Sequence, residues 1–200
     1  MLRRVFPSFL GRSTNDCCMN TSIARIAVFC ASSFGASPEF ELAARELGAL
    51  LAHHGIELVF GGTDSGLMGA LARAVLNNGG RAIGVVPRSD EGLPIPPALS
   101  ELIVVDSVAA RKAKMLELSE ASVALPGGLG TLDELFDALA LRAIGVHEKP
   151  VALFNVGGFY DPLLAFLDGV VQMGFMKPKA RALVWSENDA ATLVSRLLSD

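Results

Sequence analysis

The chain has 200 residues, of which 51% are hydrophobic and 19% are charged, and its formal net charge is −4 at pH 7. This composition is typical of one globular domain and excludes a disordered chain. The acidic balance argues against a nucleic-acid binder, which needs a basic face to displace counterions, and no run of 18 apolar residues is present to span a membrane.

The first 22 residues differ from the rest of the chain. Arg3, Arg4 and Arg12 stand there among Ser, Thr and Asn residues. This segment predicts a disordered tail, or a start codon assigned too early with Met19 as the true start. A transit peptide is the alternative, and the apolar piece is too weak for a secretory signal.

The three cysteines, Cys17, Cys18 and Cys30, are odd in number and include no CxxC pair. Cysteines in this pattern are expected to be free thiols in a reducing compartment, so a cytoplasmic location is predicted. A zinc site has no support, and no cofactor or metal is expected.

Strand and helix patterns alternate from residue 23 onward. Strands are predicted over 23–32, 56–62, 81–87, 101–106, 121–128, 149–156 and 182–186. Helices are predicted over 37–55, 65–80, 108–120, 131–147, 161–175 and 188–199, the first of them with Ser37 as N-cap, Pro38 at its first position and Gly55 at its end. The strands are continuous apolar runs, which favours a Rossmann-like, doubly wound, mostly parallel sheet in a single domain over residues 23–200.

In such sheets ligands bind outside the carboxyl ends of the strands, and three glycine-rich turns leave predicted strand ends here. The turn "LPGGLGT" contains Gly127, Gly128, Gly130 and Thr131. Glycine lets successive N–H groups converge on an anion, and the following helix adds its positive end. Anion binding is favoured, with a packed structural turn as the alternative.

Glu134 lies three residues after Thr131, which is the spacing of a capping box. One interpretation is therefore a helix cap. The other is a carboxylate one turn below a bound phosphate, close to the sugar of a nucleotide. Asp133 and Asp137 are expected to face solvent or to assist the helix dipole.

Two further segments are weaker candidates. In "GGTDSGLMG", Gly61 and Gly62 end a strand, and close packing against a ligand or against the sheet are equally favoured. In "ARKAKM", Arg111 and Lys112 either lie on a solvated helix face or reach the same rim, where Arg suits a bidentate phosphate or carboxylate contact.

At these residues the sequence resembles a known family. "PGGLGTLDE", residues 126–134, is similar to the PGGxGTxxE signature of the LONELY GUY family, and the resemblance extends from about Ile23 to Leu198 through "FGG…GLMG", "IGVVP" and "RKAKM". These enzymes are cytokinin riboside 5′-monophosphate phosphoribohydrolases, and many members carry an old lysine decarboxylase label. The resemblance implies cleavage of the N-glycosidic bond of a nucleoside 5′-monophosphate, without a metal or a cofactor.

The resemblance also assigns roles to residues of this chain. It implies that Arg111 and Glu134 are catalytic and that the protein forms a homodimer with the site near the interface. It implies that the substrate and its phosphate are bound by Lys112, Gly127, Gly128, Leu129, Gly130 and Thr131. Gly61 and Gly62, which end a predicted strand, belong to the same implied site.

The chain departs from the family pattern mainly where the base and sugar are expected to bind. The changed positions are Val108, Ala109, Ala140, Leu141 and Thr63, and either Asp90 or Glu91 stands in for the family's acid after "IGVVP". Phosphoribohydrolase chemistry is therefore predicted more firmly than an N6-modified adenine base. The alternatives are a nucleotide or molybdopterin-type cofactor carrier of the same fold and a structural partner with a relict site.

Overall fold

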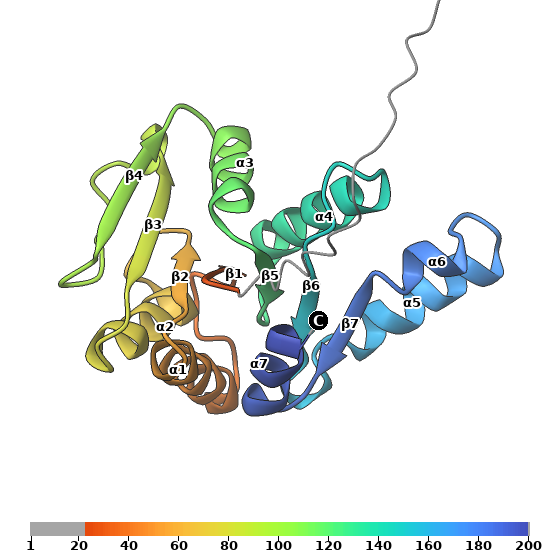
Figure 1. The fold of residues 1–200 in the computed structure, drawn as a ribbon, viewed down its shortest axis with the longest axis horizontal. Helices are drawn as coiled ribbons and strands as arrows, with labels where there is room; N and C mark the ends of the chain where they lie inside the picture. The colour runs from red at the N-terminus through yellow and green to blue at the C-terminus, as the bar shows by residue number, and fades with distance from the viewer. Residues whose placement is uncertain (1–22, 200) are drawn as a thin grey trace, which may run out of the picture.

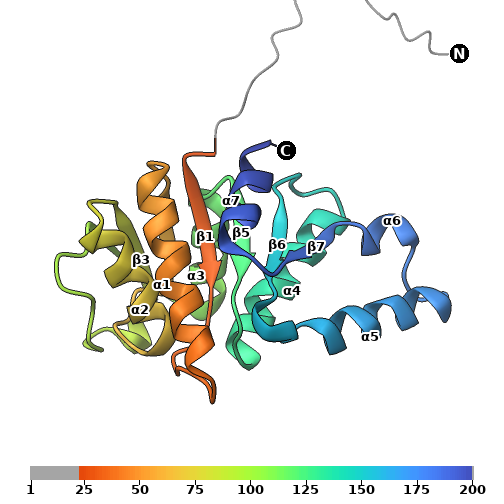
Figure 2. The ribbon, with the colours of Figure 1, turned by 90° about the horizontal axis from the view of Figure 1, so that it is seen from below.

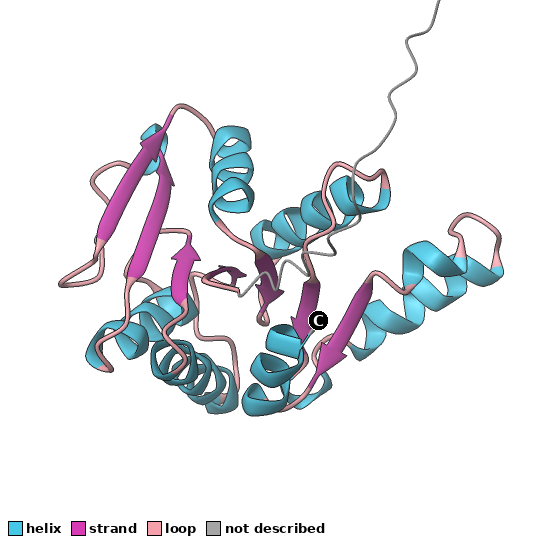
Figure 3. Cartoon of the chain, in the orientation of Figure 1, coloured by secondary structure: helices cyan, strands magenta, loops and turns pink. Residues whose placement is uncertain are grey.

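The computed structural model describes residues 23–199, so the tail predicted over residues 1–22, with Cys17 and Cys18, lies outside the described residues. Seven parallel strands form one sheet in the order β4-β3-β2-β1-β5-β6-β7 (Figures 1 and 3). The strands are β1 Arg25–Phe29, β2 Glu57–Phe60, β3 Ala82–Pro87, β4 Glu101–Val105, β5 Ala121–Ala124, β6 Val151–Phe154 and β7 Val184–Glu187. The predicted doubly wound parallel sheet is confirmed.

Helices connect the strands as the sequence predicts. They are α1 Pro38–His53, α2 Gly66–Asn77, α3 Val108–Leu118, α4 Leu129–Ala143, α5 Asp161–Gln172, α6 Pro178–Arg181 and α7 Ala190–Ser199, with short 3-10 turns η1 Arg88–Asp90 and η2 Val156–Gly158. The predicted N-cap of α1 is confirmed, because the Ser37 side chain accepts a hydrogen bond from the Glu39 N–H at 3.3 Å. The short helix α6 and the two 3-10 turns were not predicted.

The core lies on both faces of the sheet. Along β1, Ile26 and Val28 pack with the cluster under α1, α2 and α7, whereas Ala27 and Phe29 pack with the cluster under α3, α4 and α5 (Figures 1 and 2). This arrangement explains why the strands are continuously apolar. Full burial of one Leu, Val or Phe side chain contributes about 1.5–3 kcal/mol. Within residues 23–199, no helix has the length and apolar character needed to cross a membrane.

The strand order reverses between β1 and β5. The loops that follow these two strands leave the sheet in opposite directions along it, which opens a crevice at their carboxyl ends. The loop after β5 carries the glycines of "LPGGLGT", and the loop after β1 begins at Cys30. The topology therefore brings together the segments that the sequence singled out.

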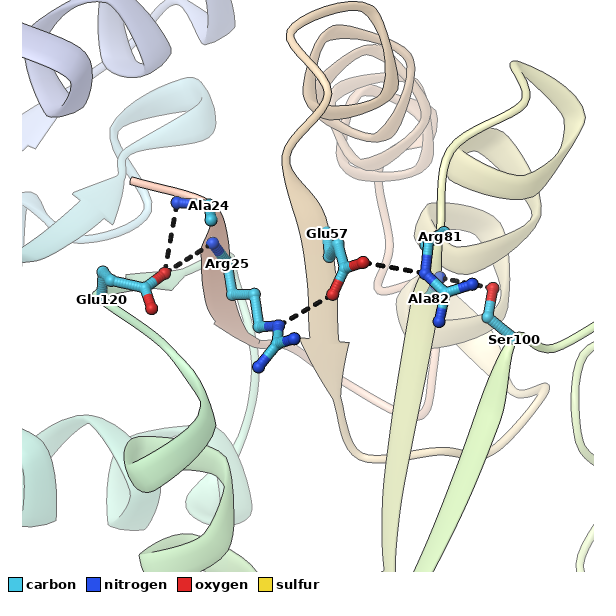
Figure 4. Close-up of polar contacts among 7 residues, drawn as sticks. All are labelled: Ala24, Arg25, Glu57, Arg81, Ala82, Ser100 and Glu120. Carbon is cyan, nitrogen blue, oxygen red and sulfur yellow. Dashed lines mark hydrogen bonds and ion pairs between the residues drawn. The ribbon is translucent and has the colours of Figure 1, made fainter. Parts of the chain in front are cut away.

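At the amino ends of the strands, opposite the crevice, charged side chains connect neighbouring strands (Figure 4). The Glu57 carboxylate accepts hydrogen bonds from Arg25 Nε and Arg81 Nε, both at 2.8 Å. The Arg25 hydrogen bond is the main cause that holds the pKa of Glu57 below its usual value. Glu120 accepts from the backbone N–H of Arg25 at 2.6 Å. These contacts tie β1, β2, β3 and the residue before β5 together, away from the crevice.

Candidate active site

A cavity of about 450 Å³ lies at the carboxyl ends of the strands. Its walls come from the loops after β1, β2, β3 and β5 and from α3 and α4. The volume is within the range of small-molecule sites. Among the residues predicted for the site, those that line it are Gly61, Arg111, Gly128, Leu129, Gly130, Thr131 and Glu134.

Helix α4 begins two residues earlier than predicted. Gly128 is the N-cap, no side chain caps the helix within the described residues, and Leu129 is the first helical residue. Thr131 is therefore the third residue of the helix rather than its cap, so the capping-box interpretation of Thr131 and Glu134 is wrong. The N–H groups of a first helical turn have no partner within the helix. Here that turn lines the cavity, and its N–H groups and the positive end of the helix are available to an anion.

The turn between β5 and α4 is held by the protein core. The Leu125 N–H donates to the Phe29 carbonyl at 2.9 Å, and the Leu125 carbonyl accepts from the buried Tyr160 hydroxyl at 2.6 Å. Burial raises the pKa of Tyr160, so its hydroxyl remains a neutral donor. A Cβ atom at Gly127 would overlap the Thr131 side chain, which explains the need for glycine there. Gly127 supports the turn and does not line the cavity.

Arg111 on α3 and Glu134 on α4 form an ion pair inside the cavity. Only 19% of the Arg111 side chain and 7% of the Glu134 side chain are exposed. Burial raises the pKa of Glu134, while the Arg111 charge acts in the opposite direction. Arg111 Nε is buried and has no hydrogen-bond partner within the described residues. The pair therefore places an ionisable carboxylate and a fixed positive charge side by side in the cavity.

Lys112 does not join this group. Its Nζ lies 2.9 Å from Asp133 and 3.5 Å from Asp137, on the outer side of α4, and Lys112 does not line the cavity. The hydrogen bond to Asp133 is the main cause that raises the pKa of Lys112. The structure thus separates Lys112 from the neighbouring Arg111, although the sequence grouped them.

The second glycine-rich turn is mainly structural. Gly61 lines the cavity, but Gly62 has a positive φ of 81° and packs against Val86. A Cβ at Gly66 would overlap the backbone of the loop after β1. The first N–H groups of α2 bond to that loop, from Leu67 to the Ser33 carbonyl at 3.3 Å, so they are occupied by the protein.

The cavity wall also includes residues outside the predicted site. Of the two acids considered after β3, Asp90 lines the cavity and Glu91 does not. Thr63, one of the changed family positions, also lines it, as do Cys30 and a pair of serines after β1, whose sequence signal is that small polar residues follow strand ends. Burial raises the pKa of the Cys30 thiol, which therefore stays protonated and is a poor nucleophile.

The changed family positions on α3 and α4 lie outside the cavity of the single chain, whereas the changed position Thr63 lines it. Val108, Ala109 and Ala140 are exposed, and Leu141 is partly exposed. Within residues 23–199, no three His, Cys, Asp or Glu side chains come together as ligands for a metal ion.

Comparison with known proteins assigns the chain to a family. A family model described as "Possible lysine decarboxylase" matches residues 68–197. A "Cytokinin riboside 5′-monophosphate phosphoribohydrolase" of Arabidopsis thaliana is 42% identical over 180 residues, which cover 90% of this chain and 84% of the relative. A "Probable cytokinin riboside 5′-monophosphate phosphoribohydrolase" of Oryza sativa subsp. japonica is 46% identical over 174 residues, which cover 86% and 77%.

The chain belongs to the LONELY GUY (LOG) family. The matched regions include both the turn before α4 and the helix α3 that carries Arg111. A solved structure of a molybdenum cofactor binding protein from the phototrophic bacterium Rippkaea orientalis is similar to this LOG-family chain, with a TM-score of 0.68, 26% identity, and coverage of 88% of this chain and 95% of the other. The LOG fold is thus shared with proteins whose names describe cofactor binding.

Proposed function

We propose that this LOG-family chain hydrolyses the N-glycosidic bond of nucleoside 5′-monophosphates to free base and ribose 5-phosphate. One observation carries this proposal: a buried carboxylate, Glu134, paired with Arg111, lies in the same cavity as the open N-terminus of α4. The names of the relatives describe this reaction for cytokinin riboside 5′-monophosphates. The proposed products are therefore a cytokinin, or adenine when AMP is the substrate.

The 5′-phosphate is proposed to bind at the start of α4. Backbone N–H groups from Gly128 to Thr131 and the Thr131 hydroxyl supply donors there, and the helix end favours negative charge. Glu134 is three residues further along the same helix. Every ring atom of the sugar is within five bonds of the phosphorus. A phosphate held by the first turn of α4 therefore brings the sugar close to the Glu134 carboxylate.

Glu134 and Arg111 are proposed to act together on the sugar. Glycosidic cleavage passes through an oxocarbenium-like state, whose positive charge the Glu134 carboxylate stabilises. The carboxylate also accepts a proton from the attacking water, whose oxygen bonds to C1′ as the base leaves with the bonding electrons and takes up a proton from solvent water. Arg111 keeps its charge in proteins, so it cannot be the acid, and its role is to orient Glu134 and to bind the phosphate or the sugar.

The proposal is tested by incubating the purified protein separately with AMP and with isopentenyladenosine 5′-monophosphate. Free base and ribose 5-phosphate are expected in equal amounts from at least one of them, measured by chromatography. The ratio of the two rates reports the preferred base, which the changed family positions at Val108, Ala109, Ala140 and Leu141 leave open. Release of base without ribose 5-phosphate would contradict hydrolysis.

The same preparation distinguishes the carrier alternative. A carrier is expected to be purified with a bound chromophore in stoichiometric amount and to release no base from either nucleotide. That combination would overturn the hydrolase. The buried Glu134 beside the first turn of α4 supports hydrolysis, because a carrier has no evident use for a carboxylate next to a phosphate.

We also propose that the chain acts as a homodimer. An exposed stripe of apolar side chains runs along α4 at helical spacing and includes Leu129, Phe136, Ala140 and Ile144. Leu129 is 87% exposed and is also part of the cavity wall. A second copy packed on this stripe would bury apolar surface and border the cavity. One of the changed family positions on α4, Ala140, belongs to the stripe.

The expected mass in solution, measured by light scattering after gel filtration, is that of two chains. Phe136→Arg is expected to convert the protein to a monomer, because it places a charge at the centre of the stripe. Leu42→Arg is the matched control, since Leu42 is an exposed apolar residue on α1, which covers the other face of the sheet. A monomeric wild type, or a Phe136→Arg variant that remains dimeric, would exclude this interface.

A further inference from the structure

The glycine turn between β5 and α4, residues 126–128, borders two cavities. Gly128 lines the main cavity and also a second, smaller cavity of about 130 Å³. The second cavity is lined mainly by apolar side chains from the loop after β1, from α1 and from η2, which include Phe34, Phe40 and Phe159. Protein interiors are normally close-packed, so a turn that borders two cavities lacks many of the contacts that fix buried backbone. Its position depends on its anchors.

The anchor at the start of the turn is Leu125. Its N–H donates to the Phe29 carbonyl at 2.9 Å, and its carbonyl accepts from the Tyr160 hydroxyl at 2.6 Å. The first of these bonds continues the pairing of β1 with β5. The next two residues, Pro126 and Gly127, make no hydrogen bond within residues 23–199. The Tyr160 hydroxyl therefore makes the last hydrogen bond to the chain before the N-cap of α4.

Tyr160 is itself firmly held. Its side chain is buried, and its backbone N–H donates to the side-chain oxygen of Asn155 at 2.7 Å. The side-chain nitrogen of Asn155 donates in turn to Asp161 at 2.7 Å. The ring of Phe159 packs edge-to-face on the Tyr160 ring, with 4.9 Å between their centroids. A hydroxyl fixed in this way defines where the Leu125 carbonyl, and the turn after it, can lie.

We propose that Tyr160 is a positioning residue for the 5′-phosphate of the substrate, because its hydroxyl fixes the turn from which α4 begins. This inference rests on the proposed function, which places the phosphate at the first turn of α4. Tyr160 does not line the main cavity. It acts through Leu125 on the position of the phosphate donors. The phosphate is bound in both the ground state and the transition state, so the effect is expected in KM rather than in kcat.

Tyr160→Phe removes one oxygen atom and keeps the ring. The buried Leu125 carbonyl then lacks its donor, which is unfavourable, and the neighbouring cavities give the turn space to shift until this carbonyl bonds to water. Phosphate binding has to reverse the shift. KM for AMP should therefore rise by about 5- to 30-fold, the effect of one buried hydrogen bond, while kcat stays within about twofold.

The measurements are the initial rate of base release against AMP concentration, and inhibition by ribose 5-phosphate and by inorganic phosphate. Both inhibition constants should rise by the same factor as KM, because both compounds use the same donors. Ser119→Ala is the matched control, since it removes another buried hydroxyl that donates to a backbone carbonyl, that of Met115 at 2.9 Å, at the end of α3. It should lower the melting temperature and leave KM and both inhibition constants unchanged.

A second variant keeps the test available if Tyr160→Phe does not fold. Phe159 is exposed, so Phe159→Leu should be tolerated, and it removes the ring that packs on Tyr160. KM should rise in the same direction by a smaller factor. An unchanged KM in the folded variants would overturn the role of Tyr160. A lower kcat with an unchanged KM would also overturn it, because Tyr160 would then affect the chemical step.

Failure of the proposed function gives a different result. If the wild type releases base from neither nucleotide, the reaction fails, and calorimetric binding of ribose 5-phosphate to the wild type and to Tyr160→Phe then decides. Weaker binding by the variant would support the positioning of the phosphate by Tyr160. Equal binding, or no binding by the wild type, would overturn it.

Discussion

Replacing Glu134 with glutamine is expected to lower the rate of base release by about 1,000-fold or more. The variant keeps the size of the side chain but removes the charge that stabilises the oxocarbenium-like state and accepts the proton of water. Steady-state release of base and the melting temperature are the measurements. The melting temperature should stay close to that of the wild type, because the glutamine amide oxygen can still accept the hydrogen bond that Arg111 donates to Glu134.

The pH dependence of the wild type provides an independent check on Glu134. Burial raises the pKa of this carboxyl above its usual 4.5. Activity that requires the ionised form is lost as the pH falls through this raised pKa, so the acid limb of kcat/KM should lie above pH 4.5. The control is Glu117→Gln, which removes an exposed carboxylate on α3 and should leave the rate unchanged. A Glu134→Gln variant with full activity would remove Glu134 from the mechanism.

Replacing Arg111 with methionine should lower kcat/KM by about 100- to 1,000-fold, because the cavity loses its charged donor. A second effect distinguishes this variant from a general loss of structure. The Arg111 charge lowers the pKa of Glu134, so its removal should move the acid limb of the remaining activity to higher pH.

Lys114→Met is the control for the Arg111 variant. Lys114 is a cation on the same helix that pairs with Glu117 at 2.9 Å and does not line the cavity. It should leave both the rate and the acid limb in place. An Arg111→Met variant whose acid limb does not move would show that the limb reports another group than Glu134.

The alternation of strands and helices was predictable because each element has strong local signals. Continuous apolar runs predict strands covered on both faces, and Ser37 and Gly55 mark the ends of α1 as the structure has them. The start of α4 was not predicted correctly. Glycine has low helix propensity, which favours a start at Thr131, but the Tyr160 hydrogen bond to Leu125 and the packing of Thr131 against Gly127 place the first turn at Leu129.

The candidate site was only partly predictable, for a related reason. Arg111 and Glu134 come together from different helices, and the family pattern placed both. Arg111 and Lys112 both pair with acids on α4, but only Arg111 lines the cavity, and the sequence of a short basic segment does not indicate which of them does so. The direction of the loop after β3 depends on a tertiary contact, the hydrogen bond from the Asp64 N–H to the Pro94 carbonyl at 2.7 Å. That direction decides that Asp90, and not Glu91, enters the cavity.

The charged network at the amino ends of the strands has a practical consequence. Strand β1 begins there at Arg25, and α7 returns to the same edge and ends at Ser199 (Figures 2 and 4). The cavity lies at the opposite, carboxyl ends of the strands. A fluorescent reporter or a solid support joined before β1 or after α7 is therefore attached on the far side of the molecule from the nucleotide entrance. Such fusions leave that entrance facing the solution.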